Sequence, residues 1–90
     1  MNYDVMPGQE VKSIIESLEP SHSVVLSRED YYKVKEYVKR FCTTTSEYRE
    51  DDGYEYKESL FFICNRILFV LIYIRLIYTK EEIYSLYRPL

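Results

Sequence analysis

The stretch Leu60–Tyr78, with the sequence LFFICNRILFVLIYIRLIY, is the most apolar part of this chain. Fifteen of its nineteen residues are Leu, Ile, Val, Phe or Tyr, and its strongly polar members are Asn65, Arg66 and Arg75. Nineteen residues suit a helix and are unusually many for a strand, although these residue types favour strands. Arg66 and Arg75 would project to opposite sides of a helix, which would therefore be apolar nearly all round. Length decides, and we predict a buried central helix over 60–78.

Two segments before this stretch carry the apolar stripe of an amphipathic helix. The first covers residues 8–19 and ends before Pro20. The second covers residues 28–42, with Ser27 as N-cap and acidic residues in its first turn. Between them, Val24–Leu26 is expected to form a brief strand or an extended link. Near the C-terminus, Thr79 and Glu82 have the spacing of a capping box, which predicts a last helix over 80–88.

Residues 43–58 break the helical pattern. They begin with three β-branched threonines, contain Asp52-Gly53 as a hairpin turn signal, and include three tyrosines, which favour strands. We expect a short hairpin of 44–50 against 54–58, with a solvated acidic loop as the alternative. Together these elements predict one mainly α domain over 1–90. It would be a small bundle of about four helices around the helix at 60–78, after a loose lead-in over 1–7.

The segment 60–78 is also long enough to raise the question of a transmembrane helix. A central Arg66 costs about 2.5–3.5 kcal/mol on insertion, which several apolar residues nearly offset. A single membrane span therefore stays open as an alternative. The two striped helices need a protein surface to pack on, and 60–78 supplies it, so we favour a soluble protein. The first ten residues do not have the pattern of a secretory signal, so we expect a cytoplasmic one. A helix that the chain cannot fully cover also predicts a homodimer.

Residue types that commonly perform catalysis are scarce. The chain has one histidine, two cysteines and two isolated glycines, which do not match the spacing of a metal site or a phosphate-binding loop. Cys42 and Cys64 lie among apolar residues and are expected to be reduced core thiols. The sequence therefore predicts no enzyme, no catalytic residues, no metal and no cofactor.

The segment 46–58 is the most acidic part of the chain, with six acids and two bases. On a hairpin it would present carboxylates and phenol rings that could meet a basic patch on a partner protein. The candidate partner-binding residues are Glu47, Tyr48, Glu50, Asp51, Asp52, Tyr54, Glu55 and Tyr56. A solvated polar turn is the alternative. Arg66 and Arg75 form a second candidate surface, because each must reach water or a carboxylate at the rim of the core.

These observations predict a small non-enzymatic protein–protein interaction module, a regulator or inhibitor of a larger protein. The composition, with no Ala, two Gly and eleven Tyr, is similar to that of accessory proteins of large phages and other viruses, which implies the host cytoplasm. One alternative is a DNA-binding helical or winged-helix regulator that uses the bases of residues 28–42. Acids interrupt those bases and the net charge is -3, so nucleic acid is the weaker expectation. A single-span membrane protein is the second alternative.

Overall fold

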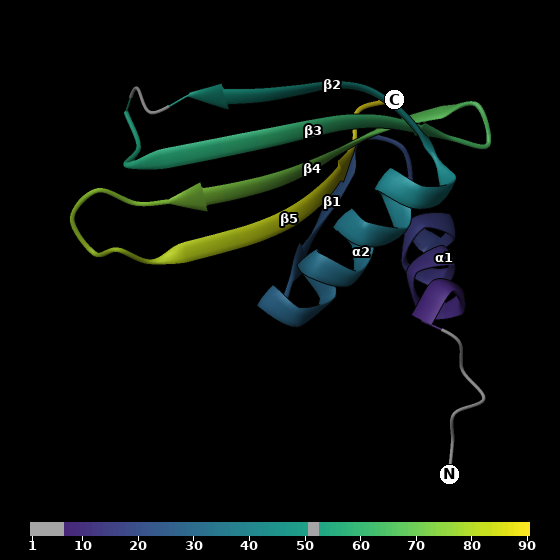
Figure 1. Ribbon diagram of the computed structural model, residues 1–90, viewed down its shortest axis with the longest axis horizontal. Helices are drawn as coiled ribbons and strands as arrows, with labels where there is room; N and C mark the ends of the chain where they lie inside the picture. The colour runs from purple at the N-terminus through teal and green to yellow at the C-terminus, as the bar shows by residue number, and fades with distance from the viewer. Residues whose placement is uncertain (1–6, 51–52) are drawn as a thin grey trace, which may run out of the picture.

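The computed structural model describes residues 7–50 and 53–90 and shows a five-stranded antiparallel sheet with two helices (Figure 1). In chain order the elements are α1 (Pro7–Ser17), β1 (His22–Leu26), α2 (Arg28–Phe41), β2 (Thr43–Glu50), β3 (Tyr56–Cys64), β4 (Ile67–Arg75) and β5 (Glu82–Arg88). The strand order is β1-β5-β4-β3-β2, so the last four strands form a meander and β1 lies beside β5. The prediction of a mainly α, helical bundle is wrong.

The central helix predicted over 60–78 is instead most of a β-hairpin. Its first residues complete β3, and β4 follows after a two-residue turn in which Cys64 pairs with Ile67. Asn65 and Arg66 in this turn have φ angles of 55° and 67°, as a type I′ hairpin turn requires. Folding at Asn65 divides the apolar stretch between strands of nine residues, a length at which its β-branched and aromatic residues favour the sheet. None of the helices in the described part of the chain is long and apolar enough to cross a membrane.

The helix predicted over 80–88 is also wrong, because residues 82–88 form β5 and residues 80 and 81 belong to the turn before it. The Thr79 hydroxyl accepts a hydrogen bond from the Glu81 amide at 3.2 Å, which closes a turn and does not cap a helix. Lys80 adopts a positive φ of 62°, and the Leu76 amide donates to the Glu81 carbonyl at 2.9 Å. After this turn β5 pairs with β4 on one side and β1 on the other, so tertiary pairing overrides the local capping signal.

The two amphipathic helices and the first hairpin are confirmed. α1 and α2 match the expected ranges within two residues at each end, and the Ser27 hydroxyl accepts from the Asp30 amide at 3.1 Å. β1 shows that the region around Val24–Leu26 is a strand. β2 and β3 pair with Glu50 opposite Lys57, and β3 continues beyond the predicted end at residue 58. The predicted lead-in lies outside the described residues except for Pro7, where α1 begins.

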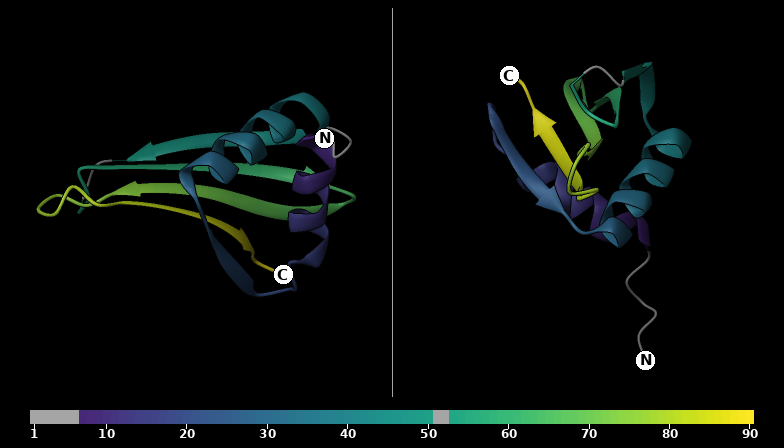
Figure 2. Two further views of the ribbon diagram at one scale, coloured as in Figure 1. Left: turned by 90° about the horizontal axis from the view of Figure 1, so that it is seen from below. Right: turned by 90° about the vertical axis from the view of Figure 1, so that its left-hand side faces the viewer.

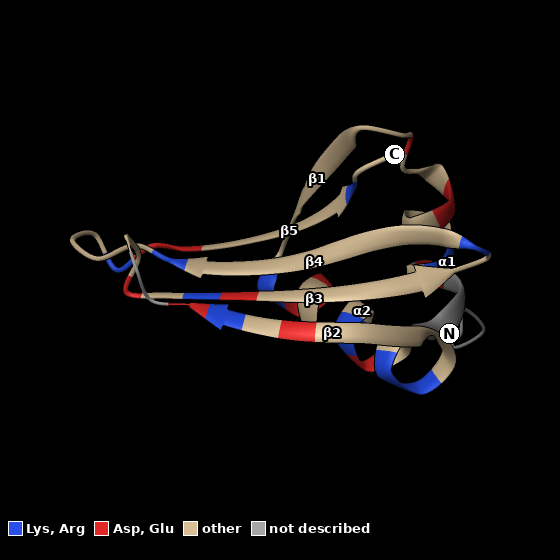
Figure 3. Cartoon of the chain, turned by 90° about the horizontal axis from the view of Figure 1, so that it is seen from above, with Lys and Arg blue, Asp and Glu red and all other residues tan. Residues whose placement is uncertain are grey.

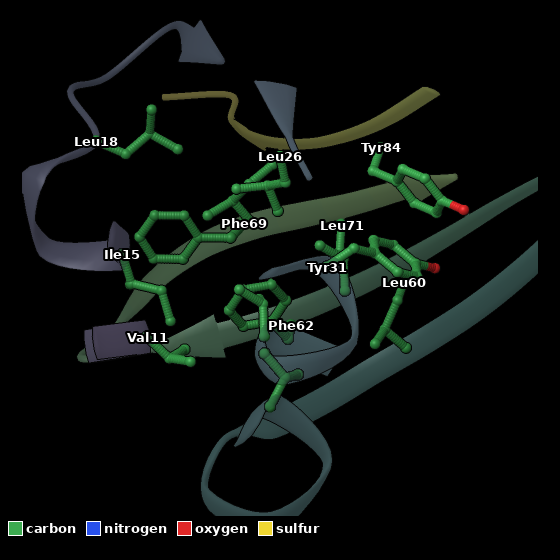
Figure 4. Close-up of a cluster of buried hydrophobic side chains, with 13 residues drawn as sticks. Val11, Ile15, Leu18, Leu26, Tyr31, Leu60, Phe62, Phe69, Leu71 and Tyr84 are labelled. Atoms are coloured by element: carbon green, nitrogen blue, oxygen red, sulfur yellow. The ribbon is translucent and has the colours of Figure 1, made fainter. Parts of the chain in front are cut away.

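The core lies between the helices and one face of the sheet. Seen from below, the helices lie in front of the strands, whereas from above the strands lie in front of the helices (Figures 2 and 3). Figure 4 shows Val11 and Ile15 of α1 beside the rings of Phe62 and Phe69, which stack with centroids 5.4 Å apart. The other buried apolar side chains of this layer are Leu18, Leu26, Tyr31, Val34, Val38, Leu60, Leu71, Tyr84 and Leu86.

The opposite side of the sheet, here called the outer face, is also apolar. Because side chains alternate along a strand, the cross-strand register assigns every second residue to this face. Its apolar members are Val25, Tyr48, Phe61, Ile63, Leu68, Val70, Ile72, Ile74, Ile83 and Tyr87. Among the described residues, no helix or further strand covers this face (Figure 3).

Replacing Arg66 with glycine is expected to stabilise the protein by about 0.5–1 kcal/mol, because a left-handed backbone strains a residue that has a Cβ. Arg66 stands at the second turn position, where type I′ turns favour glycine. Urea unfolding monitored by circular dichroism measures the change. Arg66→Ala is the matched control: it removes the same charge but keeps the Cβ, so it should not stabilise. Equal gains from both variants would assign the effect to charge.

Candidate protein-binding surface

Strand β2 forms one edge of the sheet and is exposed along nearly its whole length. Seven of its eight residues, Thr43–Arg49, are exposed, and Glu50 is half-buried. In the described part of the chain β2 pairs with β3 on one side and with no strand on the other (Figure 3). The backbone N–H and C=O groups on the free side of such a strand can pair with a strand from another chain.

A bulge divides β2 into an irregular beginning and a regular end. The register shifts between Thr44 and Ser46, and the Thr45 hydroxyl donates to the Phe61 carbonyl at 3.1 Å. From Ser46 to Glu50 each residue then pairs with successive residues of β3. Bulges at an edge limit indiscriminate pairing, so the segment 46–50 is the part of β2 best arranged to accept an added strand.

The predicted tyrosine and carboxylate surface is split between the two faces of the sheet. Glu47 and Arg49 lie opposite Leu60 and Glu58, on the side of the helices. Tyr48 points to the outer face and is 58% exposed. The half-buried members of the set are Glu50, Tyr54, Glu55 and Tyr56. Asp51 and Asp52 lie outside the described residues.

Two of the predicted acidic side chains, Glu47 and Glu55, make ion pairs within the chain. Glu55 contacts Lys80 of the β4–β5 turn, and its carboxylate lies 3.7 Å from the Arg75 guanidinium. The hydrogen bond from Lys80, together with the charge of Arg75, lowers the pKa of Glu55. Arg75 also lies 3.7 Å from Glu82. Sequence reasoning missed these contacts because Lys80 stands 25 positions from Glu55. The acidic segment is therefore only partly available to a partner.

Glu58 anchors β2 and β3 to helix α2. It is 5% exposed, and its carboxylate accepts from Lys35 Nζ at 2.9 Å and lies 3.5 Å from Arg49 Nε. Burial by itself would raise the pKa of Glu58, but the contacts with Lys35 and Arg49 outweigh it and lower that pKa. The hydroxyl of Tyr31 donates to the same carboxylate at 3.4 Å. This buried network fixes the position of β2 from its inner side and leaves its free edge open.

Arg66 and Arg75 do not form one surface, because they lie at opposite ends of β4. Arg66 borders a cavity of about 670 Å³ between α1, the end of α2 and the β3–β4 turn. Cys42 and Cys64 line the same cavity as free thiols. Burial, together with the neighbouring Cys64 thiol, raises the pKa of Cys42 to about 12, so this thiol stays protonated at neutral pH. Within residues 7–50 and 53–90, no group of three or more His, Cys, Asp or Glu side chains is arranged to hold a metal.

The bases of helix α2, considered above for DNA binding, are largely engaged by carboxylates. Lys33 lies 3.4 Å from Glu10 of α1, Lys35 pairs with Glu58, and Arg40 lies 3.8 Å from Glu36. Helix α2 also packs its apolar side against the sheet. Three of the five basic groups of α2 are thus held in ion pairs with carboxylates.

Comparison with protein-family models, with curated proteins and with solved structures found no match.

Proposed function

We propose that this chain is a non-enzymatic interaction module that binds an extended segment of a partner protein along the free edge of β2. The observation that carries this proposal is the exposed edge strand with a regular backbone over 46–50. Backbone hydrogen bonds from an added strand supply affinity, and side-chain contacts on alternate residues supply specificity. The network around Glu58 supports it further, because a strand held in place loses little freedom on binding.

The side chains next to this edge define the chemistry of the partner. The exposed ring of Tyr48 offers contact area on the outer face, and tyrosine is frequently an energetic centre of interfaces. Glu50 adds a carboxylate on the same face as Tyr48, whereas the Glu47 carboxylate on the helix side accepts from Arg49 at 3.2 Å. The matching segment is extended, with an apolar residue for Tyr48 and a Lys or Arg for Glu50. The chain would act as a regulator or inhibitor of that partner, in the cytoplasm.

Replacing Tyr48 with lysine is expected to reduce capture of the partner at least tenfold. Loss of a central aromatic contact costs about 2 kcal/mol or more, and the added positive charge repels a basic segment. The measurement is affinity capture from lysate of the native host, with quantitative mass spectrometry of proteins retained by each variant. Tyr78→Lys is the matched control, because Tyr78 is 93% exposed in the β4–β5 turn, away from β2. It should retain the same partner as the unaltered chain.

Strand addition also predicts a change in the backbone of β2 that a simple side-chain contact would not cause. In the complex, amide hydrogen exchange should slow within 46–50, where an added strand pairs with the free edge. Equal capture by Tyr48→Lys and the unaltered chain, or unchanged exchange in β2, would contradict the proposal. Salt-sensitive binding to duplex DNA at low ionic strength would instead support the DNA-binding alternative.

A further inference from the structure

The outer face of the sheet combines a large apolar surface with almost no net charge. Its charged members among the described strand residues are Glu50 and Lys57, which are cross-strand neighbours at one end of the sheet. Between Arg66 in the preceding turn and Arg75 at its end, β4 presents no charged residue (Figure 3). Ile63 and Leu68 remain 37% and 39% exposed. The charged groups of a highly charged partner would have few opposite charges to pair with on this face. An apolar and neutral partner surface is complementary to it.

Two neighbouring cross-strand rows on this face differ in profile. In one row Ile72 of β4 is flanked by the small residues Ser59 and Ser85, so its side chain stands above its neighbours. In the next row Val70 is flanked by the rings of Phe61 and Tyr87. Val70 is only 5% exposed although it points away from the helices, so its neighbours cover most of it. The face therefore has one apolar side chain between two small residues in one row, and two aromatic rings in the next.

We propose that a second copy of this chain covers the outer face, with Ile72 of each copy seated over Val70 of the other. A two-fold axis between the two rows brings the β4 strands together in opposite directions. Each Ile72 then packs against the row of Phe61, Val70 and Tyr87 in the other copy, and the same contact occurs twice, as an isologous interface requires. The two sheets form a sandwich with an interior about 10 Å thick.

The size of the face is sufficient for such a dimer. Five strands about 4.8 Å apart and up to nine residues long, at about 3.3 Å per residue, give roughly 600–700 Å² per copy. The total of about 1,200–1,400 Å² reaches the range of stable, specific interfaces. The pair Glu50 and Lys57 stays at the rim, where both side chains keep access to water. The backbone edge of β2 is not used, so a strand can still be added there, but Tyr48 lies in the row of Ile72 and borders both proposed surfaces.

The test is the mass of the protein in solution, measured by size-exclusion chromatography with light scattering. The unaltered chain should show twice the 11.0 kDa of one chain and should dissociate on dilution. Ile72→Lys places two charges in the apolar interface and should weaken dimerisation at least 100-fold, leaving a monomer. Tyr78→Lys is the matched control, because it adds the same charge in the β4–β5 turn and should remain dimeric.

A second, milder variant covers the case in which Ile72→Lys does not fold. Ile72→Thr keeps a β-branched strand residue and should weaken the dimer about tenfold, with an unchanged circular dichroism spectrum. An unaltered chain that stays monomeric at roughly 100 μM, where even weak interfaces form, overturns the proposal. A dimer that persists unchanged in folded Ile72→Lys also overturns it, because the interface then lies elsewhere. Monomeric Ile72→Lys should still capture the β2 partner, which separates the two proposals.

Discussion

Replacing Phe62 with alanine is expected to lower the free energy of unfolding by about 3–5 kcal/mol. Phe62 is fully buried at the centre of the sheet, stacked on Phe69 and covered by the helices. Its removal loses the transfer energy of the ring and leaves a cavity that flanking strands, fixed by their register, cannot fill. A chain of ninety residues has little more stability than this, so much of the variant should be unfolded at 37 °C. Urea unfolding at 25 °C measures the loss.

Phe41→Ala is the matched control for this variant. Both residues are phenylalanines that the sequence places in apolar surroundings, but Phe41 is 66% exposed at the end of α2, where it contacts Tyr37. Its replacement should change the free energy of unfolding by about 0.5 kcal/mol or less. Similar losses from Phe41→Ala and Phe62→Ala would contradict the placement of the core between the helices and one face of the sheet.

The parts of the fold that the sequence predicts correctly are those decided by neighbouring residues. Helix α2 has an apolar stripe at helical spacing and a serine N-cap that bonds to the amide three residues on. The hairpin of β2 and β3 follows from β-branched residues and a glycine turn signal. For α2 the deciding contacts lie within a few positions of the residue that signals them, so no knowledge of the rest of the chain is needed.

The central helix predicted for Leu60–Tyr78 is wrong because this stretch does not show the alternation of apolar and polar residues that is typical of a strand. An antiparallel sheet with one solvated face alternates apolar and polar residues, but β4 carries apolar side chains on both faces. A continuous apolar run of this kind is equally consistent with a buried helix. The turn also lacks the glycine that usually marks a type I′ hairpin. Asn65 is therefore the one local signal of the turn between β3 and β4. The loss of alternation is itself informative, because strands with two apolar faces are typically covered on both.

For the candidate surface, the sequence identified the segment but not how its side chains are used. Strand periodicity sends Tyr48 and Glu47 to opposite faces, and the bulge at Thr44–Ser46 decides which residue takes which face. Carboxylates that the sequence places in a polar segment form ion pairs with bases far along the chain. Glu58, for example, pairs with Lys35, which is 23 positions away. Such pairs depend on how the helix lies across the sheet, which a single sequence does not encode in any local pattern.

Replacing Lys35 with methionine is expected to destabilise the protein by about 3 kcal/mol at pH 7. Lys35 is the closest base to the buried Glu58, and its removal leaves that carboxylate with the more exposed Arg49. An unpaired buried charge is costly, whereas methionine retains most of the lysine side chain's apolar packing. Urea unfolding across a pH series measures the loss. Lys33→Met is the matched control: its partners Glu10 and Glu29 are exposed, so little measurable change is expected.

The pH dependence of this loss distinguishes charge from packing. The pKa of Glu58 is lowered in the folded protein, so its charge stabilises the fold above its usual pKa of 4.5. That contribution disappears as the pH falls through the lowered folded-state value, because the carboxyl becomes protonated. The stability difference between the unaltered chain and Lys35→Met should therefore be largest near pH 7 and should shrink below pH 4.5. A difference that stays constant down to low pH would assign the effect to the packing of the lysine chain. The proposed preorganisation of the β2 edge by a buried ion pair would then lose its electrostatic basis.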